Sequence, residues 1–337
     1  MAGPADGEPP PDELPGEFRL IARHFRPLAA APGALALADD AALLDPPPGR
    51  TLVLAADAMV AGVHFLPDDP PETIGRKLLR VNLSDLAAMG AEAIGYLMTT
   101  ALSPAMGEAW LEGFTRGLAE DQVRFGVVLL GGDTVSSPGP VTLSLTIIGA
   151  VSPGRALRRN GARAGDALWV SGTIGDGALG LDALTGRLPG LAPAARERLA
   201  CRYRLPEPRL PLGRALVGVA TACMDVSDGL VQDVGHLARG AGLAAVIEAA
   251  LVPLSGPARE AVAADPALLA RCLTGGDDYE LAFAAPEGAA ASVRAAAARA
   301  GIEVARIGRF EAGRGVRVIG ADGAPMALAR GGWSHVA

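Results

Sequence analysis

The sequence predicts two domains that each mix helices and strands, an α+β (mixed α/β) fold. The chain has 337 residues, more than one hydrophobic core usually supports, since domains of roughly 150 residues are typical. Hydrophobic residues make up 50% of the chain and charged residues 20%, which leaves enough apolar material for buried sheets. Helical and strand-like runs alternate in both halves, and a loop rich in Gly, Arg and Pro separates the halves near residue 155.

In the first half, apolar residues recur at helical spacing from Glu17 to Leu28, from Glu72 to Met89 and from Glu108 to Phe125. Strand-like runs occupy residues 94–102, 127–130 and 51–56, and the last of these ends at Asp57. Residues 141–147 alternate with period two, which predicts a half-buried strand at an edge or an interface of a sheet.

The second half begins with a predicted strand at residues 168–170. Further strands are predicted at 222–225, 244–248, 280–284, 304–307 and 316–319. Helices are predicted at 178–185, 210–219, 230–239 and 289–300.

Charge and composition exclude several classes of protein. The net charge is −7 and no segment is a Lys/Arg run, which argues against a nucleic-acid partner because phosphate backbones bind basic surfaces. The three cysteines lack the spacing of a zinc site, and no apolar run approaches the ~20 residues of a membrane span. Residues 1–15 are rich in Pro, Gly and acid and predict a disordered lead-in rather than a signal peptide. We therefore expect a soluble cytoplasmic protein.

Aspartates recur in five short strings along the chain, most of them after a strand-like run. The strings are Asp39-Asp40, Asp57, Asn82-Leu83-Ser84-Asp85, Gly131-Gly132-Asp133 and Asp225-Val226-Ser227-Asp228-Gly229. If these carboxylates meet, their repulsion raises their pKa values unless cations neutralise them, and an all-oxygen ligand set favours Mg²⁺. Magnesium ions held by several carboxylates are typical of phosphoryl transfer.

Each string also has a simpler interpretation. Asn82 and Asp85 lie three residues apart on a predicted helix and could form an exposed polar stripe or a local hydrogen bond. Ser227 or Asp228 could be the N-cap of the following helix, although capping does not explain Asp225. The two glycines before Asp133 could form a tight turn. Only the recurrence of the pattern favours the functional interpretation.

A Rossmann-type dinucleotide-binding protein is the alternative from another class. Residues 175–180, Gly-Asp-Gly-Ala-Leu-Gly, fit G-x-G-x-x-G after a predicted strand and at the start of a helix. No second strand ending in an acid follows about 20 residues later, so helix packing or a phosphate contact explains this string better.

The positions of lysine and histidine limit the kinds of ligand site that the chain can form. Lys77 is the only lysine and does not lie in a P-loop, so a nucleotide-using enzyme of this sequence must hold phosphates through metals and arginines. His64, a few residues after Asp57, is the histidine best placed to contact a ligand.

Together with residues 62–65 (Gly-Val-His-Phe) and 275–281 (Gly-Gly-Asp-Asp-Tyr-Glu-Leu), the acidic strings resemble the thiamine-monophosphate kinase family. The resemblance runs in order from about Gly16 to Trp333. That family shares a superfamily with aminoimidazole ribonucleotide synthetase and selenophosphate synthetase. The resemblance implies a two-domain aminoimidazole ribonucleotide synthetase-like fold with domains at 16–152 and 153–337, and a homodimer whose N-terminal sheets join across the two-fold axis.

The resemblance also implies an activity and its residues. The activity is the Mg²⁺-dependent transfer of the γ-phosphoryl group of ATP to thiamine monophosphate, which gives thiamine diphosphate. Several Mg²⁺ ions would be held by Asp40, Asp57, Asp85, Asp133 and Asp225, with Asp228 binding a further ion. ATP would contact Gly132, Asp133, Arg159 and Ser227, and the thiamine site would be lined by His64, Asp277 and Trp333. The chain departs from the family pattern at Ala55-Ala56, where Ser or Thr is usual, and at Asp277, where Glu is usual.

The expected mechanism follows from charge. Thiamine monophosphate offers an anionic oxygen as nucleophile, so no strong general base is needed, and we expect direct in-line transfer without a phosphoenzyme. Another ATP-dependent enzyme of the same superfamily, such as a ring-closing synthetase, is the alternative within this class.

Overall fold

The computed structural model describes residues 16–329 and 331–333, so the predicted disordered lead-in at 1–15 lies outside the described residues. The chain divides into two compact units, one made of residues 1–82 and 93–150 and the other of residues 83–92 and 151–337. The domain limits 16–152 and 153–337 remain a prediction from the sequence. Within the described residues, no helix combines the length and the apolar character that crossing a membrane requires.

The first unit begins with a helical segment and continues with a sheet and two long helices. Its elements are α1 (Gly16–Leu20), the π-helical turn η2 (Ile21–Phe25), the 3-10 segments η3 (Arg26–Leu28) and η4 (Pro32–Leu37), β1 (Thr51–Val60), α2 (Pro71–Ala88), β2 (Glu92–Leu102), α3 (Glu108–Phe125), β3 (Val128–Ser136) and β4 (Thr142–Val151). Proline suits the first turn of α2, and Gly126 ends α3 in the left-handed conformation, with φ 66°. The last residues of α2, from Leu83 on, belong to the second unit.

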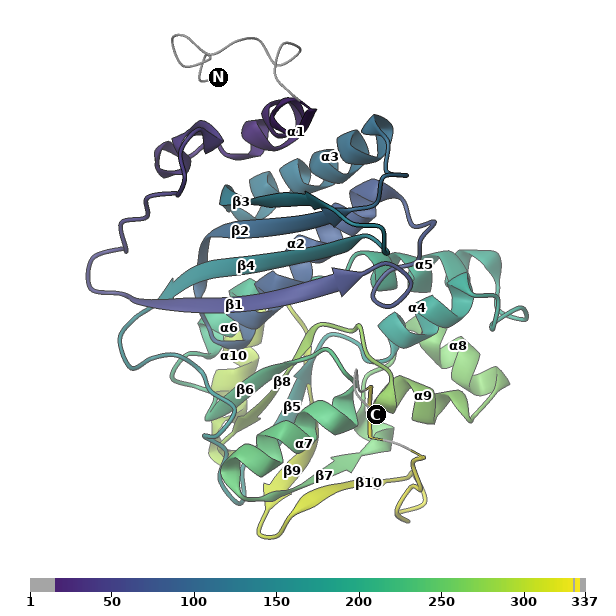
Figure 1. Ribbon diagram of the computed structural model, residues 1–337. Helices are drawn as coiled ribbons and strands as arrows, with labels where there is room; N and C mark the ends of the chain where they lie inside the picture. The colour runs from purple at the N-terminus through teal and green to yellow at the C-terminus, as the bar shows by residue number, and fades with distance from the viewer. Residues whose placement is uncertain (1–15, 330, 334–337) are drawn as a thin grey trace. The chain divides into compact units, whose positions relative to one another are not determined.

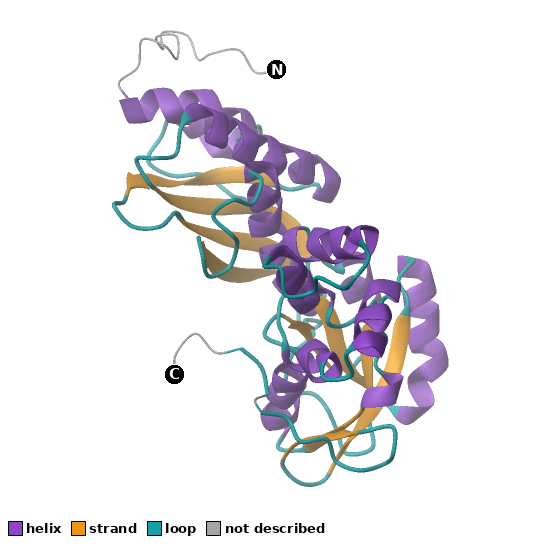
Figure 2. Cartoon of the chain, turned by 90° about the vertical axis from the view of Figure 1, so that its right-hand side faces the viewer, coloured by secondary structure: helices purple, strands orange, loops and turns teal. Residues whose placement is uncertain are grey.

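The strands of the first unit form a sheet in the order β1-β4-β2-β3, and α2 and α3 cover one of its faces (Figures 1 and 2). Leu143, Leu145 and Ile147 of β4 are fully buried, while the alternating Ser144 and Thr146 are half-buried, as the period-two pattern predicts. β4 is an inner strand, because β1 and β3 form the edges. The expected edge position of this strand is therefore wrong.

A buried ion pair joins α2 to α3. Arg80 donates from Nε to Oδ2 of Asp121 (2.5 Å) and from Nη2 to Oδ1 (3.0 Å), and both side chains are buried. The helices approach closely because α3 has a glycine at the contact: a Cβ on Gly117 would lie 2.1 Å from the carbonyl oxygen of Glu72. The bidentate pair therefore neutralises a charge that the close packing removes from water.

The second unit has a larger sheet. Its elements are β5 (Ala167–Ser171), α4 (Asp176–Leu184), α5 (Pro193–Arg204), α6 (Leu210–Leu216), β6 (Ala222–Val226), α7 (Leu230–Ala241), β7 (Ala244–Glu248), η5 (Ala249–Leu251), α8 (Gly256–Ala264), α9 (Leu268–Thr274), β8 (Glu280–Ala285), η6 (Glu287–Ala289), α10 (Ala290–Ala300), β9 (Val304–Glu311) and β10 (Gly315–Ile319). The strand order is β10-β7-β9-β5-β8-β6. β7 and β10 pair in parallel, and the other neighbours pair antiparallel.

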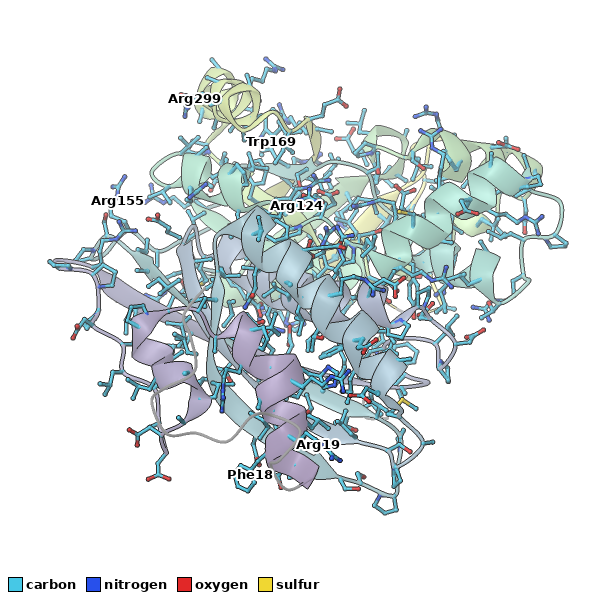
Figure 3. All side chains as sticks on the ribbon, turned by 90° about the horizontal axis from the view of Figure 1, so that it is seen from above. Phe18, Arg19, Arg124, Arg155, Trp169 and Arg299 are labelled. Carbon is cyan, nitrogen blue, oxygen red and sulfur yellow. The ribbon has the colours of Figure 1, made fainter. Side chains whose placement is uncertain are left out.

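Helices cover both faces of this sheet: α7 lies on one face and α10 on the other (Figures 1 and 2). Leu168 and Val170 of β5 belong to the same buried cluster as Leu230 and Val234 of α7. Trp169, labelled in Figure 3, alternates with them and stacks on Phe283 of β8, with 6.4 Å between the ring centroids. Burial on both faces explains why these strands are almost continuously apolar in sequence.

The predicted strands of the second unit are confirmed, but α5, α8 and α9 are not predicted from the sequence. α8 follows Ser255-Gly256-Pro257, which is typical of a turn, although Ser255 is in fact its N-cap and accepts a hydrogen bond from the Ala258 amide. β1 and β3 extend past their predicted ends, to Val60 and Ser136.

We predict that Asp121→Ala lowers the free energy of unfolding by about 3–5 kcal/mol, because it removes the carboxylate that neutralises buried Arg80. Glu120→Ala removes a largely exposed carboxylate of the same helix and should change the free energy by only about 0.5–1 kcal/mol. Urea denaturation of the two variants measures the difference. Equal losses would show that the Arg80–Asp121 pair does not stabilise the α2–α3 contact.

Candidate functional site

The first unit contains a cavity of about 600 Å³ lined by its N-terminal segment and by β2, β3 and β4. Its volume is within the range of small-molecule sites. Asp39, Asp40, Gly132 and Asp133 line it, together with apolar side chains such as Phe25. The predicted metal ligands Asp40 and Asp133 and the predicted ATP contact Gly132 therefore line one cavity.

The backbone of β3 explains why glycine precedes Asp133. Gly132 has a φ of 156°, and a Cβ there would lie 1.8 Å from the carbonyl oxygen of Met98 in β2. The parallel β2–β3 register shifts just before this point, between Tyr96 and Leu97. Asp133 therefore lies inside a strand beside an irregularity, and the interpretation of the glycines as a tight turn is wrong.

Asp57 also lies inside its strand rather than after it, because β1 continues to Val60. Its backbone N–H donates to Oδ1 of Asn82 (3.0 Å), and its carbonyl oxygen accepts from the Ser144 hydroxyl (3.3 Å). Asn82 is fully buried and donates to the Leu78 carbonyl oxygen (2.9 Å). The local hydrogen bond expected for Asn82 is confirmed, and its assignment to an exposed stripe is wrong.

His64 lies in the turn that follows β1. Its Nδ1 accepts from the Val60 N–H (3.0 Å), so the neutral ring carries its proton on Nε2. Lys77, buried on α2, donates from Nζ to the His64 carbonyl oxygen (2.9 Å). The single lysine of the chain therefore stabilises the turn that contains His64.

In the second unit, the end of α2 contacts β6. The Ser84 hydroxyl donates to Oδ2 of Asp225 (2.8 Å), and both side chains are buried. Asp85 is the next residue after Ser84. Two of the acidic strings, 82–85 and 225–229, therefore meet through this hydrogen bond.

The turn Val226–Gly229 joins β6 to α7, and a carboxylate from within the helix caps it. Oδ2 of Asp233 accepts from the N–H groups of Asp228 (3.0 Å) and Gly229 (3.1 Å). The pKa of Asp233 is raised to about 8, mainly by burial and then by the charges of Asp225 and Asp228, while the Asp228 and Gly229 N–H groups oppose the rise. The interpretation of Ser227 or Asp228 as the N-cap is wrong, because Gly229 occupies that position and Asp233 satisfies the amides.

The loop Gly275–Tyr279 runs against this turn. The Asp277 N–H donates to the Ser227 carbonyl oxygen (2.9 Å), and the Tyr279 N–H donates to the Val226 carbonyl oxygen (2.8 Å). A Cβ on Gly276 would lie 2.3 Å from the Ser227 carbonyl oxygen, so the close approach requires glycine.

The segment that carries Trp333 binds the same turn from the other end of the sequence. The Trp333 N–H donates to the Asp228 carbonyl oxygen (2.9 Å), and its carbonyl oxygen accepts from Nε2 of Gln232 (2.6 Å). The Trp333 side chain is 46% exposed. Ser227, Asp228, Asp277 and Trp333, which come from three distant segments, therefore lie together.

The glycines of the G-x-G-x-x-G string serve packing. The backbone N–H groups of Gly175 and Gly177 donate to the two carboxylate oxygens of Asp278, at 2.7 and 2.9 Å. A Cβ on Gly180 would lie 2.2 Å from the Leu199 carbonyl oxygen of α5. β5 pairs antiparallel with both neighbours, unlike the first strand of a dinucleotide fold. The helix-packing interpretation is confirmed, and the dinucleotide-binding alternative is wrong.

Arg159 lies beside α7. Burial lowers the pKa of His236, and the charges of Arg239 and Arg159 lower it further, whereas Asp228 opposes them. The charge of Arg159 therefore acts in the same neighbourhood as that of Asp228.

The sequence-predicted site residues divide between the units. The first unit holds Asp40, Asp57, His64, Gly132 and Asp133, and the second holds Asp85, Arg159, Asp225, Ser227, Asp228, Asp277 and Trp333. Within the part of the chain that the structure describes, no group of three or more His, Cys, Asp or Glu side chains is placed to hold a metal ion.

Sequence reasoning missed four supporting residues: Ser84, Gln232, Asp233 and Asp278. Ser84 lies in the 82–85 string and Asp278 in the 275–281 string, so the position of both residues in the sequence indicated a role near the site. Asp233 is an acidic residue in the first turn of a helix, which is a recognisable pattern. Nothing in the sequence indicates the role of Gln232, because its partner, the Trp333 carbonyl oxygen, is distant in the sequence.

Comparison with known proteins gives consistent matches. Residues 38–151 match the family "AIR synthase related protein, N-terminal domain", and residues 163–321 match the corresponding C-terminal domain family. The thiamine-monophosphate kinase of Caulobacter vibrioides is 44% identical over 98% of this chain and 94% of its own length. The crystal structure of thiamine-monophosphate kinase from Stenotrophomonas maltophilia superposes with a TM-score of 0.78 at 40% identity, covering 86% of this chain and 90% of that one. The structure of AaThiL complexed with AMPPCP and TMP has a TM-score of 0.74 at 31% identity, covering 88% and 91%.

We predict that Asp278 makes stability fall as pH rises. The pKa of its carboxyl is raised to about 8, mainly by burial; the charge of Asp176 also raises it, whereas the Gly175 and Gly177 N–H groups and Arg202 lower it. The folded state therefore prefers the protonated form, so this contribution is complete below the ordinary pKa near 4 and is lost as pH rises through about 8.

Asp278→Asn cannot titrate, so the parent should lose stability relative to this variant between about pH 4 and pH 8, by at most about 1.4 kcal/mol per pH unit. Urea denaturation across this range measures the difference. A difference that does not change with pH would show that Asp278 does not titrate in this window.

Proposed function

Because the chain belongs to the thiamine-monophosphate kinase family, we infer that it transfers the terminal phosphoryl group of ATP to thiamine monophosphate and releases thiamine diphosphate and ADP. The observation that carries this function is the family match over nearly the whole chain. The relative solved with AMPPCP, an ATP analogue, and TMP supports the same pair of substrates.

Charge neutralisation is the main task of such a site, since donor and acceptor are both anionic. Lysine cannot supply it here, because Lys77 is the only lysine and is buried against the His64 carbonyl oxygen. We propose that Arg159 and Mg²⁺ take this role, with Gly132, Asp133 and Ser227 as further contacts of ATP.

The proposed Mg²⁺ ligands are Asp40, Asp57, Asp85, Asp133, Asp225 and Asp228. All are hard carboxylate donors, as Mg²⁺ prefers. Mg²⁺ in phosphoryl-transfer sites is usually held by one or two carboxylates plus water and substrate phosphates, so a closed cage of three protein ligands is not required. Bound Mg²⁺ would neutralise charge on the phosphate oxygens and lower the repulsion between donor and acceptor.

We propose direct in-line transfer without a phosphoenzyme. An anionic phosphate oxygen of thiamine monophosphate forms the new bond to the terminal phosphorus of ATP, while the bond from that phosphorus to the bridging oxygen breaks and ADP leaves. The acceptor oxygen carries no proton that a strong base must remove. The protein therefore has only to bind and orient the two substrates.

The acceptor site is proposed at His64, Asp277 and Trp333. Trp333 offers an exposed aromatic face for the pyrimidine ring, and Asp277 offers an acceptor for its amino group. His64 presents an N–H at Nε2, because Nδ1 accepts from Val60.

We also propose a homodimer formed through the sheet of the first unit. The alternate positions of β1 that face away from buried Val53 and Met59 are all apolar: Leu52, Leu54, Ala56, Ala58 and Val60. Leu54 is 62% exposed and Leu97 of β2 is 40% exposed. An apolar strand face of this kind is typical of an interface between subunits. The cytoplasm, where ATP is supplied, is the proposed location.

A substrate comparison tests the function. The purified chain is incubated with ATP and Mg²⁺ and with thiamine monophosphate, thiamine or formylglycinamidine ribonucleotide, and the products are identified by mass. We expect thiamine diphosphate and ADP only from the first. Ring closure of the ribonucleotide would instead support the synthetase alternative, and phosphorylation of thiamine alone would exclude the proposed acceptor.

We predict that Asp57→Asn and Asp133→Asn each lower kcat by about 100-fold or more without unfolding the protein, since each removes a charge proposed to hold Mg²⁺. Rates are measured across a Mg²⁺ titration, with circular dichroism as the check on folding. Glu112→Gln is the control. It neutralises an exposed carboxylate of α3 and should leave the rate unchanged. Full activity of either aspartate variant at low Mg²⁺ would contradict the metal assignment.

We predict that Trp333→Ala raises KM for thiamine monophosphate about tenfold and leaves KM for ATP little changed, because the ring can stack on the pyrimidine but cannot bind phosphate. Steady-state kinetics with each substrate varied in turn measures both constants. If Trp333 only anchors the C-terminal segment, both constants should rise together and thermal stability should fall.

We predict a dimer at micromolar concentration in sedimentation experiments, and a monomer for Leu54→Glu, which places a charge on the apolar face of β1. Val123→Glu changes an exposed residue of α3 that is 86% accessible and should leave the dimer intact. A monomeric parent chain would refute the proposed assembly.

A further inference from the structure

The start of α4 is occupied by a carboxylate from a distant loop. Asp278 is 1% exposed, and its two oxygens accept from the Gly175 and Gly177 N–H groups at 2.7 and 2.9 Å. Helix N-termini carry N–H groups without partners in the helix and a partial positive charge, so they favour an anion. Asp278 therefore supplies, from within the chain, the two acceptor oxygens that a phosphate supplies at other helix starts.

The glycines at this helix start make room for the loop. A Cβ on Gly177 would lie 2.3 Å from the Asp277 carbonyl oxygen, and a Cβ on Gly175 would lie 2.4 Å from Cβ of Cys272 in α9. Gly175 also has a φ of 89°, which other residues rarely adopt. The glycines of the string that resembled a dinucleotide motif therefore allow the 275–279 loop and α9 to pack against the start of α4.

The residues on either side of Asp278 adopt an unfavourable backbone conformation. Asp277 has a φ of 72° and Tyr279 a φ of 53°, and such conformations persist only where surrounding contacts impose them. Their N–H groups donate to the Ser227 and Val226 carbonyl oxygens. The loop is therefore held on one side by the Val226–Gly229 turn and on the other by the Asp278 carboxylate.

We propose that Asp278 is a positioning residue for the acceptor site: by binding the start of α4, it fixes the backbone of Asp277 and so directs that side chain toward the thiamine moiety. This role rests on the proposed function, which assigns Asp277 to the acceptor. Asp278 is buried and does not itself touch substrate. It acts through the loop.

Asp277 is the proposed acceptor residue that lies next to this anchor in the chain. Ser227 and Asp228 are also held by β6 and by the Asp233 cap. The backbone of Asp277 continues directly into Asp278, whose carboxyl group is bound at the start of α4. A small displacement of its backbone should therefore weaken recognition of the acceptor more than recognition of ATP.

Asp278→Ala tests the role, with formate as a probe that can replace the lost carboxylate. We expect KM for thiamine monophosphate to rise about tenfold, KM for ATP to stay within about twofold, and formate to reverse most of the rise. Asp166→Ala is the matched control, because Asp166 is also buried and accepts from a backbone N–H, that of Arg163, and from the Thr221 hydroxyl. Its KM for thiamine monophosphate should not respond to formate.

Asp278→Asn keeps the size of the side chain and one acceptor oxygen. This variant replaces the alanine variant in the test if the alanine variant does not fold. It should raise KM for thiamine monophosphate less than Asp278→Ala and should not respond to formate. An unchanged KM for thiamine monophosphate in both variants, or equal rises for both substrates without rescue, would overturn the positioning role. Failure of the parent chain to form thiamine diphosphate would instead refute the proposed function itself.

Discussion

The hydrogen bonds around the turn Val226–Gly229 are the constraint on which the candidate site of the second unit depends. Main-chain groups of this turn bind Asp277 and Tyr279 on one side and Trp333 on the other, and Asp233 caps its two last amides. All these bonds use backbone atoms of the turn. The side chains of Ser227 and Asp228 can therefore serve binding while the backbone holds the structure.

Buried carboxyl groups accept the hydrogen bonds of the backbone N–H groups at two helix starts. Asp233 caps the start of α7 and Asp278 caps the start of α4, and burial raises the pKa of each to about 8. Neither residue is the N-cap in sequence, since one lies inside its helix and the other comes from a loop about a hundred residues away. Both helix starts are thus satisfied by the protein itself, which leaves cations and arginine to neutralise the substrates.

The sequence predicted the strands of the second unit and most long helices, because their apolar spacing is regular over many residues. It did not predict where β1 and β3 end. Asp57 and Asp133 interrupt apolar runs, and a polar residue inside a strand cannot be distinguished from one after it without knowledge of the neighbouring strands. α8 was missed because its start, Ser-Gly-Pro, is equally typical of a turn.

The acidic strings were identified from their recurrence, but their supporting contacts were not. Ser84 and Asp225 are separated by 141 positions, and only the fold brings them within 2.8 Å. The G-x-G-x-x-G string shows that a local pattern can also mislead. It allowed a phosphate contact, but in the structure its N–H groups donate to the Asp278 carboxyl group instead. Tertiary partners decide the role of such strings.

Amide hydrogen exchange of the intact chain without substrates tests most directly the claim that backbone hydrogen bonds fix the loop Gly275–Tyr279 to its neighbours. We expect the N–H groups of Asp277, Tyr279, Gly175 and Gly177 to exchange only in large-scale opening of the second unit, as slowly as those of β6 and β8. Exchange of these four amides as fast as that of an exposed surface loop would contradict the account.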